Sequence, residues 1–197
     1  MTHSLHRTGT EGDLKKDYVL LAMLARGIND KNPESREKLI QVGEIFKKHD
    51  PVMIMQERLW TISPVITATY DDVGNVKDAL KDLKKKNLGI SIVVSGLIED
   101  IKENIREIGL QMHTVNLSLG VFGNTSKLPE DRVLEITTMC GHHCVSPAMV
   151  IDLIEKVKIG KMTMELAAET LSKPCVCGIF NKKRAIIIFR RILENPF

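Results

Sequence analysis

Two short β-branched stretches flank a charged amphipathic stretch in the middle of the chain: ISPVITATY at 62–70, VGNVKDALKDLKKK at 73–86 and ISIVV at 90–94. The outer two predict strands, and the apolar spacing of the middle one predicts a helix. Further strands are predicted at 112–119 and 133–138, and a helix at 97–108. Because alternating strands and helices indicate βαβ units, we expect an α/β fold with a small, mostly parallel sheet of about four strands and flanking helices.

Helices are predicted on both sides of this α/β core. The spacing of apolar residues over 13–26 predicts one helix, and Asn32-Pro33 is a start signal for a second that ends before Pro51. Ser146, Thr163 and Asn181 are N-cap candidates for three C-terminal helices. We expect one domain, made of a loose lead-in at 1–12, N-terminal helices at 13–50, the α/β core at 51–145 and C-terminal helices at 146–197. Three residues of the lead-in are predicted to be disordered or surface groups: His3, His6 and Arg7.

The composition excludes some classes of protein. Apolar residues make up 43% of the 197 residues, which is ordinary for a folded domain. The net charge of +3 is too balanced to favour nucleic-acid binding. The longest apolar run near the N-terminus, 19–25, is too short to span a bilayer, and no cleavage pattern follows it. The cytoplasm is therefore the expected location, and no membrane association is predicted.

Four cysteines form two close pairs: Cys140-Gly-His-His-Cys144 and Cys175-Val-Cys177. In a reducing compartment such pairs indicate metal ligands or catalytic thiols, because disulfides rarely persist there. Both pairs fall in loops between predicted elements, so they can fold back onto one metal or iron–sulfur site. Cys144 is the weakest ligand candidate of the four, and His142 or His143 is a candidate substitute.

Two features favour an iron–sulfur cluster, of the 4Fe–4S type, over the alternative, zinc. Glycines directly follow Cys140 and Cys177, which lets backbone N–H groups approach bridging sulfides. Lys182, Lys183 and Arg184 occupy the first turn of a predicted helix, where positive charge is unfavourable unless an anion lies nearby. These three residues are therefore predicted to bind an anion, either the cluster itself or a small acidic ligand.

A second set of polar residues follows the predicted strands. Ser95, Asn116 and His113 are weak catalytic candidates, because the carboxyl ends of parallel strands meet at one edge of a sheet. No GxGxxG, P-loop, GxSxG or HExxH motif is present. The sequence thus predicts an iron–sulfur protein, either an electron carrier with a redox partner protein or a small enzyme with an anionic substrate. The alternative is a zinc-stabilised interaction or regulatory module without catalysis.

Overall fold

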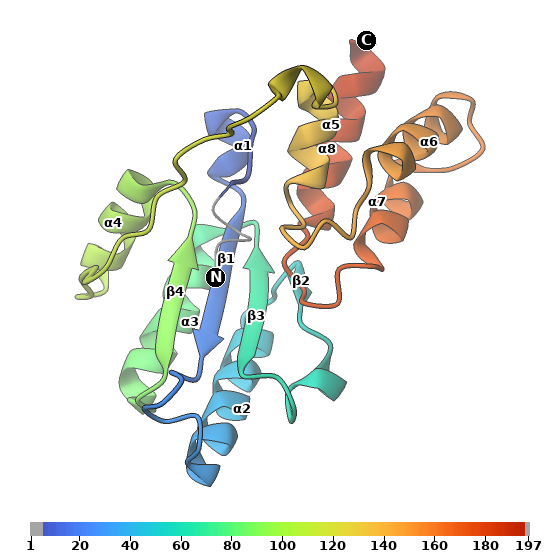
Figure 1. The fold of residues 1–197 in the computed structure, drawn as a ribbon. Helices are drawn as coiled ribbons and strands as arrows, with labels where there is room; N and C mark the ends of the chain where they lie inside the picture. The colour runs from blue at the N-terminus through green and yellow to red at the C-terminus, as the bar shows by residue number, and fades with distance from the viewer. Residues whose placement is uncertain (1–5, 196–197) are drawn as a thin grey trace.

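The centre of the fold is a four-stranded sheet, shown in Figure 1, in a computed structural model that describes residues 6–195. The strands are β1 (Tyr18–Met23), β2 (Met53–Ile54), β3 (Val65–Tyr70) and β4 (Ser91–Ser95). The α-helices are α1 (Glu11–Leu14), α2 (Pro33–Lys48), α3 (Val73–Lys86), α4 (Ile98–Glu107), α5 (Asp131–Thr137), α6 (Pro147–Lys158), α7 (Met164–Ser172) and α8 (Lys182–Glu194). Two 3₁₀ turns complete the described part of the chain: η2 (Glu57–Leu59) and η3 (Thr125–Lys127).

The sheet is entirely antiparallel, so the prediction of a mostly parallel sheet is wrong. Its strand order is β2-β3-β1-β4, and Leu20 at the centre of β1 lies opposite Ala68 on one side and Val94 on the other. β3 and β4, which α3 connects, are each antiparallel to β1 and therefore run in the same direction. They are not neighbours, because β1 lies between them. The βαβ prediction failed because it did not include β1.

The helix predicted over 13–26 is wrong for the same reason. Residues 18–23 form β1, and residues 18–22 are buried. A central strand that is covered on both faces is apolar at every position rather than at alternate positions. A short run of this kind cannot be distinguished from a buried helix by its periodicity. Within this predicted helix the only helical residues are those at the end of the short α1, which Thr10 caps.

Two more predicted strands are absent from the described residues. The stretch 133–138 lies mostly in α5, because Val133, Ile136 and Thr137 share one buried helical face. Residues 112–119 belong to an exposed segment without sheet partners, although Val115, Leu117 and Leu119 alternate with polar residues or glycine. No strand of the described sheet lies beside this segment to hydrogen-bond with its backbone, so the alternating pattern does not produce a strand.

The remaining predicted helices are confirmed, and their start signals act as caps. The side chain of Asn32 accepts a hydrogen bond from the Glu34 N–H at the start of α2. Ser146, Thr163 and Asn181 cap α6, α7 and α8 in the same way. A capping oxygen satisfies one of the N–H groups that a helix start leaves without a partner.

Six of the eight described α-helices form two groups around the sheet. α2 and α3 pack against β1 and β3, and α5 to α8 pack on one another to one side of the sheet, as Figure 1 shows. The loops between α5 and α6 and between α7 and α8 carry all four cysteines. Of the helices within residues 6–195, none is both long enough and apolar enough to cross a membrane.

Candidate metal site at the junction of sheet and C-terminal helices

The first cysteine pair lies in a tight turn between α5 and α6. The His143 N–H donates to the Cys140 carbonyl over 3.1 Å, and His143 adopts a left-handed conformation with φ of 61°. Cys140 is buried beneath this turn, whereas Cys144 is exposed. The turn therefore presents one inward thiol and one thiol at the surface.

The second pair lies in the CxC loop (residues 174–178), which is attached to the sheet through its backbone. The Thr67 hydroxyl donates to the Cys177 carbonyl, and the Thr69 hydroxyl donates to the Gly178 carbonyl over 3.0 Å. The Gln56 N–H donates to the Val176 carbonyl over 3.3 Å. Three successive carbonyls are thus satisfied by β3 and the segment that follows β2, and both thiols of the loop are buried.

Gly178 follows Cys177 because of backbone packing. Its φ is +72°, and a Cβ atom there would lie 2.1 Å from the Ile54 carbonyl carbon and 2.2 Å from the Met55 nitrogen. Only glycine adopts this conformation without strain and leaves room for the adjoining backbone. The close approach of Gly178 to β2 accounts for the glycine without any reference to bridging sulfides.

The two loops bring the thiols together, as the sequence predicts. The four cysteines lie near each other, 4.0–4.1 Å apart. The Sγ atoms of Cys175 and Cys177 are closer still, at 3.6 Å, and His142 Nδ1 lies 3.5 Å from Cys177 Sγ. These contacts are pairwise: within residues 6–195, no three or more His, Cys, Asp or Glu side chains already form a set that could hold an ion.

The hydrogen bonds among the three buried thiols make Cys177 the one with the lowest pKa. The bond that Cys140 makes to Cys175, together with burial, raises the pKa of Cys140 well above its usual range. The same bond lowers the pKa of Cys175, but its bond to Cys177 and its burial outweigh this and raise it to about 11. The bond from Cys175 lowers the pKa of Cys177 despite burial. Cys177 is therefore the first of these three thiols to become a thiolate, the form that binds metals and acts as a nucleophile.

The three basic residues at the start of α8 have carboxylate partners. Lys182 Nζ lies 2.9 Å from Glu169, and Lys183 Nζ lies 2.8 Å from Asp71. Arg184 turns inward and lies 2.7 Å from Asp17, with both side chains buried. Anion binding by Lys182, Lys183 and Arg184 stays a prediction.

The catalytic candidates lie away from the cysteines. Ser95 ends β4, which is at the opposite edge of the sheet from β2, and the CxC loop is attached to β3 and to the segment that follows β2. His113 and Asn116 are exposed on the segment that follows α4, which Figure 1 shows on the α4 side of the molecule. The argument for one shared edge depended on parallel strands, which the sheet lacks. A catalytic role for these three residues stays a prediction.

Sequence reasoning missed the polar residues that surround the cysteine loops. Arg7, predicted as a surface group, has a side chain that is only 5% exposed, and it forms an ion pair with the fully buried Asp17. His6 is exposed, as predicted, and His3 lies outside the described residues. An isolated Arg in a polar lead-in carries no local signal of burial. Asp17 was hidden by the incorrect helix prediction for 13–26.

Comparison of the chain with family models, with curated proteins and with solved structures found no match.

Proposed function

We propose that this protein binds one soft transition-metal ion, zinc by preference, and that the ion stabilises the junction between the C-terminal helices and the sheet. The proposed ligands are Cys140, Cys144, Cys175 and Cys177. Thiolates are the ligands that soft metals prefer, and four of them complete the closed tetrahedral shell of a structural site.

The observation that carries the proposal is the spacing of the cysteines. Zn–S bonds of about 2.3 Å in a tetrahedron place the ligand sulfurs about 3.8 Å from one another. The Sγ–Sγ distance of 3.6 Å between Cys175 and Cys177 is close to that value, and the four cysteines lie 4.0–4.1 Å apart. A 4Fe–4S cluster binds each cysteine to a different iron, which requires a wider separation of the sulfurs. The spacing therefore supports a single ion better than the predicted cluster.

The role of the ion follows from where its ligands originate. Cys140 and Cys144 belong to the loop between α5 and α6, whereas Cys175 and Cys177 belong to the CxC loop that β3 holds. An ion bound to both loops would connect them across the junction with the sheet. Closing the shell requires Cys144 to turn inward from its exposed position. If it does not, His142 beside Cys177 is the alternative fourth ligand.

The metal content of protein purified without oxygen tests the proposal. We expect one zinc ion per chain by elemental analysis, and a colourless protein. Replacement of zinc by cobalt should give the strong visible absorption of tetrahedral thiolate coordination. A brown protein with several irons and acid-labile sulfide would favour the cluster, and a single iron per chain would keep the site but change the metal. Four reactive thiols and no bound metal would contradict the proposal.

Single substitutions identify the fourth ligand. Cys144→Ser and His142→Ala should differ: the variant that removes the true ligand should shift the cobalt spectrum and weaken binding. His143→Ala is the matched control, since His143 is adjacent but is held in a left-handed conformation at the surface. Loss of zinc from His143→Ala alone would show that the assigned ligand set is wrong.

A further inference from the structure

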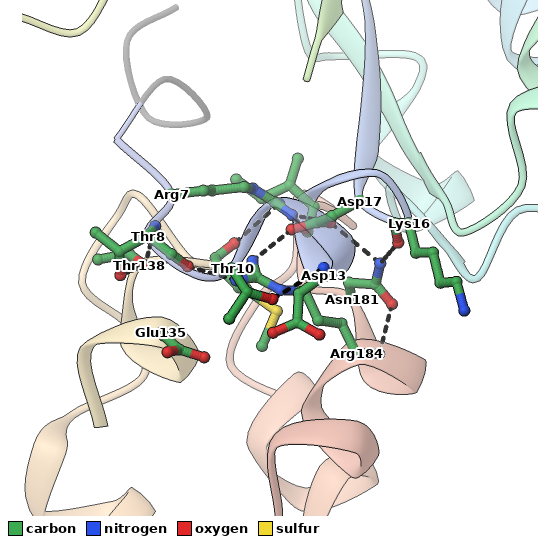
Figure 2. A network of polar contacts seen from close by, with 12 residues as sticks. Arg7, Thr8, Thr10, Asp13, Lys16, Asp17, Glu135, Thr138, Asn181 and Arg184 are labelled. Carbon is green, nitrogen blue, oxygen red and sulfur yellow. Dashed lines mark hydrogen bonds and ion pairs between the residues drawn. The ribbon is translucent and has the colours of Figure 1, made fainter. Parts of the chain in front are cut away.

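A buried cluster of charged side chains lies beside the two cysteine loops. The arginine clamp, as we name it, consists of Arg7, Asp17 and Arg184, and Figure 2 shows how the three side chains meet. Arg7 and Arg184 each pair with one oxygen of the Asp17 carboxylate. The side chains are 5%, 0% and 1% exposed, respectively. The clamp therefore buries two positive charges against one negative charge.

The clamp touches the backbone on both sides of the cysteine site. The Arg7 guanidinium donates to the Met139 carbonyl over 3.2 Å and also to the Ile179 carbonyl. Met139 directly precedes Cys140, and Ile179 lies two residues after Cys177. One side chain thus connects the α5–α6 loop with the α7–α8 loop. A shift of the Arg7 side chain would therefore also shift the backbone beside Cys140 and close to Cys177.

The second arginine holds the N-terminal segment in place. Arg184 donates to the Thr8 carbonyl, and it occupies the space left by the missing side chain of Gly9. The Thr8 N–H donates to the Thr138 hydroxyl over 3.2 Å. The side-chain amide of Asn181 donates to Asp17 over 3.1 Å and to the Lys16 carbonyl over 2.9 Å. Residues 7–17 are thereby fixed against the ends of both cysteine loops.

The clamp alone has one excess positive charge, and the adjoining group of Arg191, Asp13 and Glu135 has one excess negative charge. Arg7 Nε and Arg184 Nε are buried and have no hydrogen-bond partner among the described residues. Burying a charge without a compensating opposite charge is costly. Four thiolates around a divalent cation carry a net negative charge, and the clamp holds the loops that present them. The contacts of Arg7 with both loops therefore relate the clamp to the metal-loaded form.

We infer that the arginine clamp positions the metal ligands, so that metal binding and docking of residues 7–17 stabilise each other. This inference rests on the proposed metal site. Residues that orient ligands from outside the coordination shell typically change metal affinity by about 10- to 100-fold. Coupling between two sites is reciprocal, so metal removal should loosen the N-terminal segment to the same extent as loss of the clamp weakens metal binding.

Arg7→Gln tests the positioning role, with Arg191→Gln as its matched control. Arg191 also ties the N-terminal segment to the helices, through Asp13 of α1 and Glu135 of α5, and neither of these carboxylates lies in a cysteine loop. We expect Arg7→Gln to weaken zinc binding by about 10- to 100-fold, measured by competition with a chromophoric chelator, and Arg191→Gln to change it by less than about threefold. Arg7→Lys keeps the charge and should recover part of the affinity.

Hydrogen exchange of the wild-type protein gives a readout that needs no variant. Zinc should slow exchange of the amides of residues 7–17, and a chelator should reverse this. Equal zinc affinity in wild type and Arg7→Gln, or exchange in residues 7–17 that does not respond to zinc, would overturn the clamp alone. A wild-type protein that binds no metal would contradict the proposed function, and the clamp with it.

Discussion

Two irregular segments of this protein both contain apolar residues and glycine but have opposite environments. Both the CxC loop and the exposed segment (residues 111–122) contain apolar residues and at least one glycine, and the exposed segment also carries polar residues such as Gln111, His113 and Asn116. In the CxC loop, β3 donors bind the Cys177 and Gly178 carbonyls and both cysteines are buried. In the exposed segment, Leu119 is 84% exposed and Phe122 is 80% exposed. Apolar composition therefore does not by itself bury a loop. Burial requires a surface that satisfies the loop backbone as well.

Adding one methyl group to each loop should produce the largest difference. In Gly178→Ala the new Cβ meets the Ile54–Met55 backbone, and φ is +72°. We expect a loss of about 3 kcal/mol or more in the free energy of unfolding, measured with urea. Gly120→Ala is the matched control, because Gly120 has φ of +96° with nothing near its Cβ position. It should cost about 1 kcal/mol or less, and similar losses in both variants would show that the close contact with β2 is not decisive.

Metal removal should affect only one of the two loops. A ligand at about 100 times its dissociation constant stabilises the folded state by about 2.7 kcal/mol, so chelation should lower the melting temperature by several degrees. Hydrogen exchange should accelerate in residues 174–180 and remain unchanged in the exposed segment. Faster exchange in both segments would indicate global destabilisation instead of a local metal site.

The threonine hydroxyls of β3 should contribute a smaller amount. Thr67→Val and Thr69→Val each remove a buried donor to the CxC loop while keeping the side-chain shape. Each should cost about 1–3 kcal/mol, because a buried carbonyl is left without its partner. Thr114→Val in the exposed segment is the control, and it should lie within about 0.5 kcal/mol of wild type in the same urea titration. If the Thr67→Val and Thr69→Val variants have the same free energy of unfolding as wild type, contacts other than these hydroxyl groups hold the loop.

The smallest effect is expected at the most exposed apolar side chains of the exposed segment. Leu119→Ser and Phe122→Ser should change the free energy of unfolding by less than about 0.5 kcal/mol, because these side chains are already in water. Urea unfolding and the molar mass in solution provide the check. A loss above about 1 kcal/mol, or a change in molar mass, would show that the segment packs on a surface in solution.

Local signals in the sequence were sufficient for most helices. Asn32, Asp72 and Ser146 cap helices through their own side chains, and a cap depends only on residues a few positions away. The strands β3 and β4 were predicted from β-branched composition in the same way. Sheet topology was not predictable from these signals. Which strand separates β3 from β4 is set by β1, whose uniform burial removes the alternation that would have identified it.

The same distinction between local signals and tertiary packing applies to the candidate site. The sequence by itself determined the cysteines and their position in loops, because Cys spacing and helix caps are local properties. Only the tertiary structure brought Cys140 close to Cys175 and Cys177, and placed Arg7 against carbonyls from both cysteine loops. The burial of Arg7 depends on Asp17 and on backbone groups far away in the chain, and no local pattern encodes those partners. Contacts between residues distant in sequence form only when the whole chain has packed, which is why the ligands were predictable and the side chains that position them were not.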